Sequence, residues 1–296
     1  MHLEITHLLR LAGPVDVIVE DLGHVVPYGV ERITHIPSVI FFRHLHRRTL
    51  PGQVSLGARV ALDALERAYP LIYRRSPVVA PSQSALQDLR GLGFEASRLH
   101  QIGYGVNLRA FSPGVLTEQP SLVYFAGMRR YKRPQHALYL LKNLITDGVR
   151  ANLFMAGSGP ESGSLEKLSR SLGLEDNVTF TGRLSDAALS ALISRSWIHV
   201  QTSVAEGWGL TVWEAAASGV PTVGYRVPGL IDSVSEGVTG ILVADGDLAA
   251  LTRAAESVIR NRRDWRARCL SEVCQRSWAD VAADWDRLLR NSLGGG

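Results

Sequence analysis

The sequence predicts an α/β protein with two Rossmann-like domains, each built on a parallel sheet, and three observations predict it. Short apolar runs alternate with amphipathic stretches of helical period along the chain, which is typical of parallel strands joined by helical crossovers. Residues 111–120 are rich in turn formers and separate two series of such units. The 296 residues, 46% of them hydrophobic, provide apolar material for two cores.

The first series of units is short. Apolar runs of strand length lie at 15–20, 37–42, 78–80 and 99–104, and helical periodicity covers 58–73 and 84–92. A parallel sheet that stops after four strands leaves an edge that proteins normally cover. We therefore expect a shortened first domain over residues 1–114.

The second series has six predicted strands, the usual number for a doubly wound nucleotide-binding domain. The strands are predicted at 122–126, 151–156, 178–181, 198–202, 221–225 and 240–243. Helical periodicity covers 134–147, 165–172, 186–194, 210–218 and 248–260. We expect this second domain to span residues 115–276, and we treat residues 277–296 as a separate helical segment.

Composition and charge limit the location and the partners. No apolar stretch approaches the ~18 residues of a membrane-spanning helix, and the start of the chain lacks the features of a secretory signal. Two cysteines, Cys269 and Cys274, suit a reducing compartment. We expect a cytoplasmic protein, and leave open a peripheral contact with the inner face of the membrane. No Cys/His set has metal-site spacing, so we expect no metal.

The net charge of +4 comes with clustered arginines. Such clusters could meet phosphate ligands, anionic lipid or nucleic acid, or could simply solvate the surface. No nucleic-acid motif accompanies them, so we expect no nucleic-acid partner. The clusters are Arg43, Arg47 and Arg48; Arg129, Arg130 and Arg133; and Arg260, Arg262 and Arg263.

The segment from Ser203 to Val223 carries the most chemical information. It follows a predicted strand and enters a helix near Leu210, so the free amides of that helix would point into the crevice at the carboxyl end of the sheet, where a phosphate binds well. Glu214, one turn into the helix, could accept hydrogen bonds from two ribose hydroxyls, and Glu206 from hydroxyls of a sugar. For either glutamate alone, a competing explanation is a solvated side chain with no ligand, placed near the amino end of the helix because the helix dipole favours a negative charge there.

Two glutamates with seven residues between them, in this strand-loop-helix setting, resemble the Glu-x7-Glu signature of family-4 retaining glycosyltransferases (glycosyltransferase group 1). These enzymes have the GT-B fold of two facing Rossmann-like domains, of which the first would be truncated here. The likeness runs from about Pro14 to Trp285, and its order and spacing are more specific than any single piece. The other similar pieces are Val79–Ser82, Gly105–Asn107, Ala156–Glu161, Val227–Val234 and Gly237–Val243.

The resemblance implies a retaining transferase that moves a hexose from a UDP- or GDP-linked sugar to a glycan or lipid-linked acceptor, without cofactor or metal. It implies that Glu206 contacts the donor sugar and Glu214 the ribose. It also implies that the segment 277–296 is the final helix, which returns to the first domain. The further donor-binding residues that it implies are Gly157, Gly182, Arg183, Gly207, Trp208, Gly209, Leu210 and Thr211.

A basic turn, Phe125 to Pro134, is the second candidate element. The family usually has a Gly-Arg pair here and a lysine some five residues later, and both cations bind the diphosphate. Aligning on the lysine selects Lys132 and puts Gly127 at the position of the arginine. We expect Arg129 to supply the missing charge; a solvated basic turn is the alternative. Fixed cations stabilise a departing diphosphate by roughly 3–4 kcal/mol in a water-poor site.

A histidine at the end of the second strand is the third candidate. Family members often carry one there, facing the donor sugar, and His44 and His46 both fit because alternate residues of an extended chain point the same way. We favour His44 because it is nearer to the strand, although a lone histidine is more often structural.

Relatives usually begin with a strand, a Gly-rich loop and a helix that help form the acceptor site, and this chain begins downstream of them. Three explanations stay open: a fragment, a natural short form completed by a partner chain, or a non-catalytic protein that binds nucleotide sugars. A Rossmann dehydrogenase is a weaker alternative, because no Gly-x-Gly-x-x-Gly follows a strand with an acidic residue about twenty positions on. Basic and aromatic residues at 43–48 and 69–75 hint at an anionic or membrane-surface acceptor.

Overall fold

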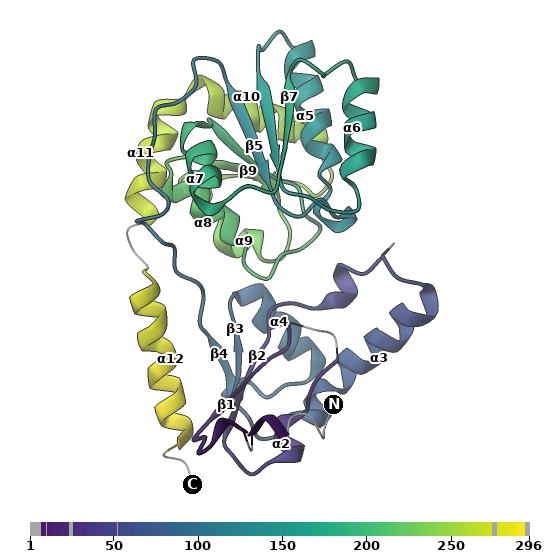
Figure 1. Ribbon diagram of the computed structural model, residues 1–296, viewed down its shortest axis with the longest axis vertical. Helices are drawn as coiled ribbons and strands as arrows, with labels where there is room; N and C mark the ends of the chain where they lie inside the picture. The colour runs from purple at the N-terminus through teal and green to yellow at the C-terminus, as the bar shows by residue number, and fades with distance from the viewer. Residues whose placement is uncertain (1–6, 10, 24–25, 52, 274–276, 294–296) are drawn as a thin grey trace. The chain divides into compact units, whose positions relative to one another are not determined.

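The computed structural model describes residues 7–9, 11–23, 26–51, 53–273 and 277–293 (Figure 1). It divides into two compact units, unit 1 with residues 1–104 and 279–296, and unit 2 with residues 105–278. Each unit contains one parallel sheet, which confirms the predicted α/β class. The start of the chain, on which the expectation of no secretory signal rests, and Cys274 lie outside the described residues.

Unit 1 is built on a four-stranded sheet in the order β1-β2-β3-β4, with every neighbouring pair parallel. Its strands are β1 (Ile18–Asp21), β2 (Ser38–Phe41), β3 (Val78–Ala80) and β4 (Leu99–Gln101). Its helices are α2 (Val30–Ile33), α3 (Leu56–Ile72), α4 (Gln83–Leu92) and α12 (Trp278–Leu293), with short 3-10 turns η1 (His46–Arg48) and η2 (Ala96–Arg98).

The two faces of this sheet bury different helices, because successive side chains of a strand point to opposite faces. Ile40 and Val78 pack in the core that includes residues of α3 and α4. Val39 and Val79 pack instead against Val281 and other residues of α12, the yellow helix beside the sheet in Figure 1. The last helix is therefore part of the core of unit 1.

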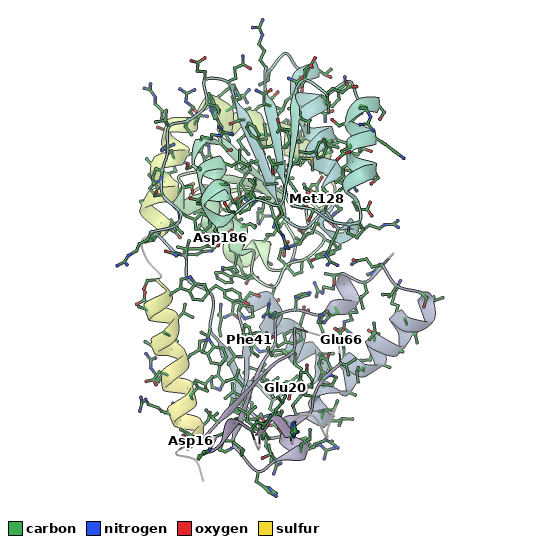
Figure 2. The ribbon with its side chains drawn as sticks, viewed as in Figure 1. Asp16, Glu20, Phe41, Glu66, Met128 and Asp186 are labelled. Carbon is green, nitrogen blue, oxygen red and sulfur yellow. The ribbon has the colours of Figure 1, made fainter. Side chains whose placement is uncertain are left out.

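Buried glutamates hold the loops of unit 1. Glu20, labelled in Figure 2, is 3% exposed and accepts hydrogen bonds from three successive backbone amides and from the Tyr73 hydroxyl. Glu31, 7% exposed, does the same for another loop. Its donors are the amides of Arg74 (2.9 Å), Arg75 (2.9 Å) and Ser76 (3.0 Å) and the Ser76 hydroxyl (2.8 Å). These carboxylates give buried loop amides the partners that a strand or helix would otherwise supply.

Unit 2 is a doubly wound domain with the strand order β10-β9-β8-β5-β6-β7, all parallel. Its strands are β5 (Ser121–Phe125), β6 (Asn152–Ala156), β7 (Val178–Gly182), β8 (Ile198–Gln201), β9 (Thr222–Tyr225) and β10 (Gly240–Val243). Its helices are α5 (Gln135–Thr146), α6 (Ser162–Ser171), α7 (Asp186–Arg195), α8 (Leu210–Ala217), α9 (Leu230–Ser233), α10 (Leu248–Arg260) and α11 (Arg262–Val273), with the 3-10 turn η3 (Arg130–Lys132).

Helices cover both faces of the six-stranded sheet. Residues of α5, α6 and α10 share the largest core, whereas residues of α7 pack on the other face with Val123 and Phe125. The strand order reverses between β5 and β8, and ligands of such sheets bind outside the carboxyl ends of the strands at this point.

The division between the units falls ten residues earlier than the expected boundary at 114/115. Residues 105–114 belong to unit 2 because their backbone is bonded to it. The Gly114 amide donates to the Ser194 carbonyl (3.3 Å), Arg266 donates to the Gly114 carbonyl (2.6 Å), and the Ser190 hydroxyl donates to the Ala110 carbonyl. The expected boundary at residue 276 lies outside the described residues.

The Glu31 carboxylate gives a stability prediction. Burial works to raise its pKa, but the hydrogen bonds from Ser76, Arg75 and Arg74 outweigh burial and hold the pKa below its usual 4.5. Glu31→Gln should lower the free energy of unfolding by about 2–3 kcal/mol at pH 7, the cost of losing hydrogen bonds to a buried charge. The exposed matched variant Glu95→Gln should stay within about 0.5 kcal/mol of wild type.

The same pair of variants has an expected pH dependence, measured by urea denaturation between pH 3 and pH 7. Because the folded-state pKa of Glu31 is lowered, its contribution is present above the ordinary value of 4.5 and is lost as the pH falls through the folded-state pKa. The difference between wild type and Glu31→Gln should therefore shrink on acidification. A constant difference across this range would contradict a structural role for the ionised carboxylate.

Candidate active site

A pocket of about 320 Å³ opens at the carboxyl ends of β5 and β6, on the face of the sheet that carries α7 and α8. It lies at the point where the strand order reverses. Predicted site residues from the loop after β6, the loop after β7 and helix α8 meet there. The pocket is lined by Phe125, Ala126, Gly127, Ala156, Gly157, Ser158, Arg183, Leu184, Leu189, Thr211 and Glu214.

Glycines let the loops at this edge approach one another. Gly157 has φ 129°, and a Cβ there would lie 2.1 Å from the Ala126 carbonyl oxygen. The Gly157 amide donates to the Gly182 carbonyl (2.8 Å), and Gly182 itself has φ 65°. Met128, labelled in Figure 2, is buried, and its amide donates to the Ser158 carbonyl of the same turn (3.1 Å). Close packing of the loops thus explains Gly157, which also lies in the pocket wall, whereas Gly182 is favoured by its positive φ alone.

The first turn of α8 also faces the pocket. Gly209 precedes it with φ 95°, and no side chain in the described part of the chain caps this helix end. The amino end of a helix with uncapped amides attracts an anion. Thr211 and Glu214 are three residues apart, so they share a face of α8, and both line the pocket. Leu210, at the helix start, is 38% exposed.

Glu214 has an unusual electrostatic setting. Its burial, and second the negative charge of Asp186 at the start of α7 (Figure 2), raise the pKa of its carboxyl above the usual value. A ligand that supplies hydroxyl donors stabilises the ionised form of such a carboxylate, because its hydroxyls replace the hydrogen bonds to water that burial has removed.

Lys132 and Glu206 form an ion pair that the sequence did not predict. Lys132 Nζ lies 2.5 Å from Glu206 Oε1, and the two side chains are only 16% and 12% exposed. The pair joins the loop after β5 to the loop after β8. The positive charge assigned to a diphosphate is therefore matched by a glutamate before any ligand binds.

Arg133 fastens these two loops together. Its φ of 48° is the one positive value for a non-glycine residue among the described residues. Its guanidinium donates to the carbonyls of Thr202 (2.9 Å) and Ser203 (3.1 Å) and to Asp245 (2.5 Å). The Thr202 hydroxyl donates back to the carbonyl of Lys132 (3.1 Å). These bonds offset backbone strain of about 1–3 kcal/mol and fix Lys132 beside Glu206. The local sequence indicates only that Arg133 is part of a basic cluster, because its partners lie about 70 and 112 positions away.

Arg129, the expected substitute for the missing arginine, has its side chain near Gly127. A Cβ built on Gly127, which lines the pocket, would lie 3.8–3.9 Å from three side-chain atoms of Arg129. Its side chain therefore passes over Gly127 at the edge of the pocket. Arg183, on the loop after β7, lines the same pocket.

The loop before α8 packs through Trp208. Its ring is 9% exposed and stacks on Trp213, with ring centroids 6.1 Å apart. The indole thus belongs to the interior of unit 2, and any ligand contact of Gly207 and Trp208 would come from their backbone.

The two candidate histidines lie in unit 1, with ring centroids 4.9 Å apart. His46 starts η1, where its amide donates to the buried Glu66 (2.6 Å; labelled in Figure 2) and its Nδ1 lies 3.5 Å from the same carboxylate. His46 is therefore engaged with a structural glutamate of its own unit. His44 is half-buried at the end of β2.

The basic cluster around these histidines is largely neutralised by acids of the same unit. Its three arginines each meet a carboxylate, so the cluster has less net charge than the sequence suggests, and the hint of an anionic acceptor is weaker here. The pairs are Arg43 with Asp21, Arg47 with Asp63 and Arg48 with Asp88.

No group of three or more His, Cys, Asp or Glu among the described residues could hold a metal ion. None of the helices in the described ranges is both long and apolar enough to span a bilayer.

Known proteins resemble this chain in sequence and in fold. N-acetyl-alpha-D-glucosaminyl L-malate synthase of Bacillus anthracis is 30% identical over 148 residues, 50% of this chain and 38% of that protein. Sucrose-phosphate synthase from Thermosynechococcus elongatus superimposes with a TM-score of 0.83 at 21% identity, covering 99% of this chain and 77% of that one. Anabaena HepE, solved with UDP and glucose, gives 0.82 at 18% identity, with 97% and 81% covered.

The chain spans about half or less of the length of the first curated relatives that it matches. A family model described as glycosyl transferases group 1 matches residues 109–272, more than half of the chain. Together with the pocket at the strand reversal and the fold similarity, this match shows that the chain has the GT-B fold and belongs to the glycosyl transferases group 1 family.

Proposed function

We propose that unit 2 binds a nucleoside diphosphate sugar, UDP- or GDP-linked, and that the protein transfers its hexose with retention to a glycan or lipid-linked acceptor. The observation that carries the proposal is a set of polar groups at one edge of the sheet of unit 2, connected through Gln201. It combines the pocket lined by Thr211 and Glu214, the uncapped start of α8, and the Lys132–Glu206 pair. The names of relatives support both donor classes, since one is GDP-mannose-dependent and another was solved with UDP.

The proposed roles follow from position. The base lies against the pocket wall that includes Gly157 and Arg183, near Gly182, and the ribose hydroxyls donate to Glu214. The diphosphate meets Thr211, the first amides of α8 and the side chain of Arg129. The sugar lies toward Glu206, which follows β8 in the loop that leads to Gly207, Gly209 and Leu210.

The proposed reaction depends on stabilisation of the negative charge that develops on the departing diphosphate. The bond between the anomeric carbon and the diphosphate oxygen breaks, and the diphosphate takes both electrons and gains negative charge. Lys132, Arg129 and the α8 amides stabilise this charge, which is largest in the transition state. The acceptor hydroxyl attacks from the face that the diphosphate leaves and gives its proton to the leaving oxygen. Because protein cations and amides serve the diphosphate, we propose that transfer needs neither metal nor cofactor.

The ion pair makes the roles of Lys132 and Glu206 interdependent. Without donor, Glu206 neutralises Lys132, whereas a bound diphosphate competes for the same ammonium group. Removal of Glu206 therefore leaves Lys132 with an uncompensated charge that a nucleoside diphosphate can use.

We also propose a cytoplasmic location, His44 as the histidine that faces the donor sugar, and a glycan or lipid-linked acceptor. The alternative is a non-catalytic nucleotide-sugar-binding subunit, or one completed by a partner chain or held at the membrane surface. The exposed edge strand β1, with Val19 46% exposed, is compatible with a partner chain. Activity separates the alternatives: purified chain that binds but never turns over donor would favour the non-catalytic one.

The donor site predicts nucleotide binding without metal. In calorimetric titrations with UDP, GDP and ADP in EDTA, we expect at least one to bind. Glu214→Ala should weaken that binding about 10- to 100-fold, because it removes charge-assisted hydrogen bonds to the ribose. Glu166→Ala, on the exposed face of α6, is the matched control and should bind as wild type. No binding of any nucleotide at millimolar concentration would refute the donor site.

The ion pair predicts that removal of the Glu206 carboxylate affects the binding of a nucleoside diphosphate and of its sugar nucleotide differently. Glu206→Ala should leave nucleoside diphosphate binding unchanged or tighter, because Lys132 is freed, and should weaken the intact sugar nucleotide. The measurement is the dissociation constant of UDP beside that of UDP-glucose, and of GDP beside that of GDP-mannose. Equal weakening of both members of a pair would contradict the role assigned to Glu206.

Lys132 should matter more for turnover than for donor affinity, because the diphosphate charge grows toward the transition state. We expect Lys132→Ala to slow release of UDP from UDP-glucose, or of GDP from GDP-mannose, about 10²–10³-fold. Arg129→Ala should cause a smaller loss, and the exposed Lys167→Ala none. Unchanged turnover in Lys132→Ala would remove this residue from leaving-group stabilisation.

A further inference from the structure

The two oxygens of the Glu206 carboxylate are used unequally. Oε1 accepts hydrogen bonds from Lys132 Nζ (2.5 Å), the Ser203 hydroxyl (2.6 Å) and Gln201 Nε2 (3.1 Å). Across the described residues no hydrogen bond to Oε2 is present. One oxygen is thus saturated by the protein while the other keeps its full accepting capacity.

Gln201 ends β8 and is 1% exposed. Its side-chain nitrogen donates both to Glu206 and to the Thr211 hydroxyl (3.2 Å), so one amide group connects the glutamate to the first turn of α8. The orientation of this amide follows from chemistry, because a flip would place its oxygen against the carboxylate. Its Oε1 is buried and has no hydrogen-bond partner in the described structure. The fold keeps this unfavourable acceptor to hold the donor on Glu206.

Ser203 is fully buried, two residues beyond the strand. The loop around it is fixed at the backbone: the Ser203 carbonyl accepts from Arg133, and the Val204 amide donates to the Tyr131 carbonyl (2.9 Å). A hydroxyl on a fixed backbone restricts the carboxylate that it binds. Glu206 is therefore held by two neutral donors in addition to its lysine.

We propose that Gln201 and Ser203 are positioning residues that hold Glu206 Oε1, so that Oε2 accepts a hydrogen bond from a hydroxyl of the donor sugar. The proposal rests on the proposed function of this site. It adds that recognition of the sugar depends on two residues that do not touch it, and that Gln201 couples this recognition to Thr211 at the diphosphate.

A merely structural role for these residues makes a different prediction. Loss of loop packing would weaken nucleoside diphosphate and sugar nucleotide together. Loss of positioning weakens only the part of the affinity that the sugar adds. That part is the sugar ratio, the dissociation constant of the nucleoside diphosphate divided by that of its sugar nucleotide.

The test uses the full chain and calorimetry with UDP and UDP-glucose, and with GDP and GDP-mannose. Ser203→Ala should lower the sugar ratio about five- to tenfold and leave nucleoside diphosphate affinity unchanged, since one hydrogen bond to the carboxylate is lost. Gln201→Met, close in shape but without the donor, should lower the ratio similarly and weaken the nucleoside diphosphate by at most about threefold through Thr211. The control is Ser196→Ala, another buried serine, which bonds the Leu192 carbonyl and should keep the wild-type ratio.

A double-mutant cycle adds a readout that folding defects do not imitate. In a Glu206→Gln background, Ser203→Ala should change the sugar ratio less than twofold, because the hydroxyl then has no carboxylate to position. Full additivity, a wild-type ratio in both single variants, or parallel weakening of both ligands would each overturn the positioning role. Absence of any nucleotide binding by wild type is a separate result: it refutes the proposed function, and this inference with it.

Discussion

The ion pair between Lys132 and Glu206 is the contact on which the rest of the candidate site depends. It links the ends of β5 and β8, the two neighbouring strands between which the sheet reverses its order. Parallel strands bring their carboxyl ends to one edge, but they do not fix the loops that leave that edge. Here the strained backbone of Arg133 and its bonds to the Thr202 and Ser203 carbonyls fix them. The fold thus holds the cation and the carboxylate beside each other, and in the proposed reaction a diphosphate has to compete with Glu206 for Lys132.

Buried and half-buried glutamates have different roles in the two units. In unit 1, both carboxylate oxygens of Glu20 and of Glu31 accept hydrogen bonds from loop amides, which leaves little accepting capacity for a ligand. In unit 2, Glu214 lines an open pocket, and one oxygen of Glu206 has no hydrogen-bond donor in the described part of the chain. Glu206 and Glu214 therefore differ from Glu20 and Glu31 in having a carboxylate oxygen without a hydrogen-bond donor among the described residues.

Much of the fold was predictable because its elements have strong local patterns. The ten predicted strands and eight predicted helices are confirmed within a few residues. Three helices, α2, α9 and α11, were not predicted. The helices α2 and α9 have four residues each, too few for a periodic pattern, and α11 is polar apart from a few buried residues such as Trp265 and Cys269.

The candidate site was predictable in its members but not in its connections. Glu206, Glu214 and Lys132 stand in recognisable motifs, whereas the pairing of Lys132 with Glu206 joins residues 74 positions apart. One feature of the sequence indicates Gln201: it is a polar residue at the end of an apolar strand. The pairing of Arg43 with Asp21, 22 positions apart, likewise could not be read from a local run of charge.

The last helix has a consequence for how the chain folds as it is synthesised. Unit 2 has all of its residues once position 278 has been made, whereas unit 1 still lacks α12 at that moment. Until then the face formed by Val39, Val79 and Ile102 has no Val281 or Leu288 to cover it. Unit 1 is therefore the later of the two units to have all of its core residues, although most of its sequence is made first. A nascent chain stalled before α12 would expose apolar surface, and chaperones bind such surface during synthesis.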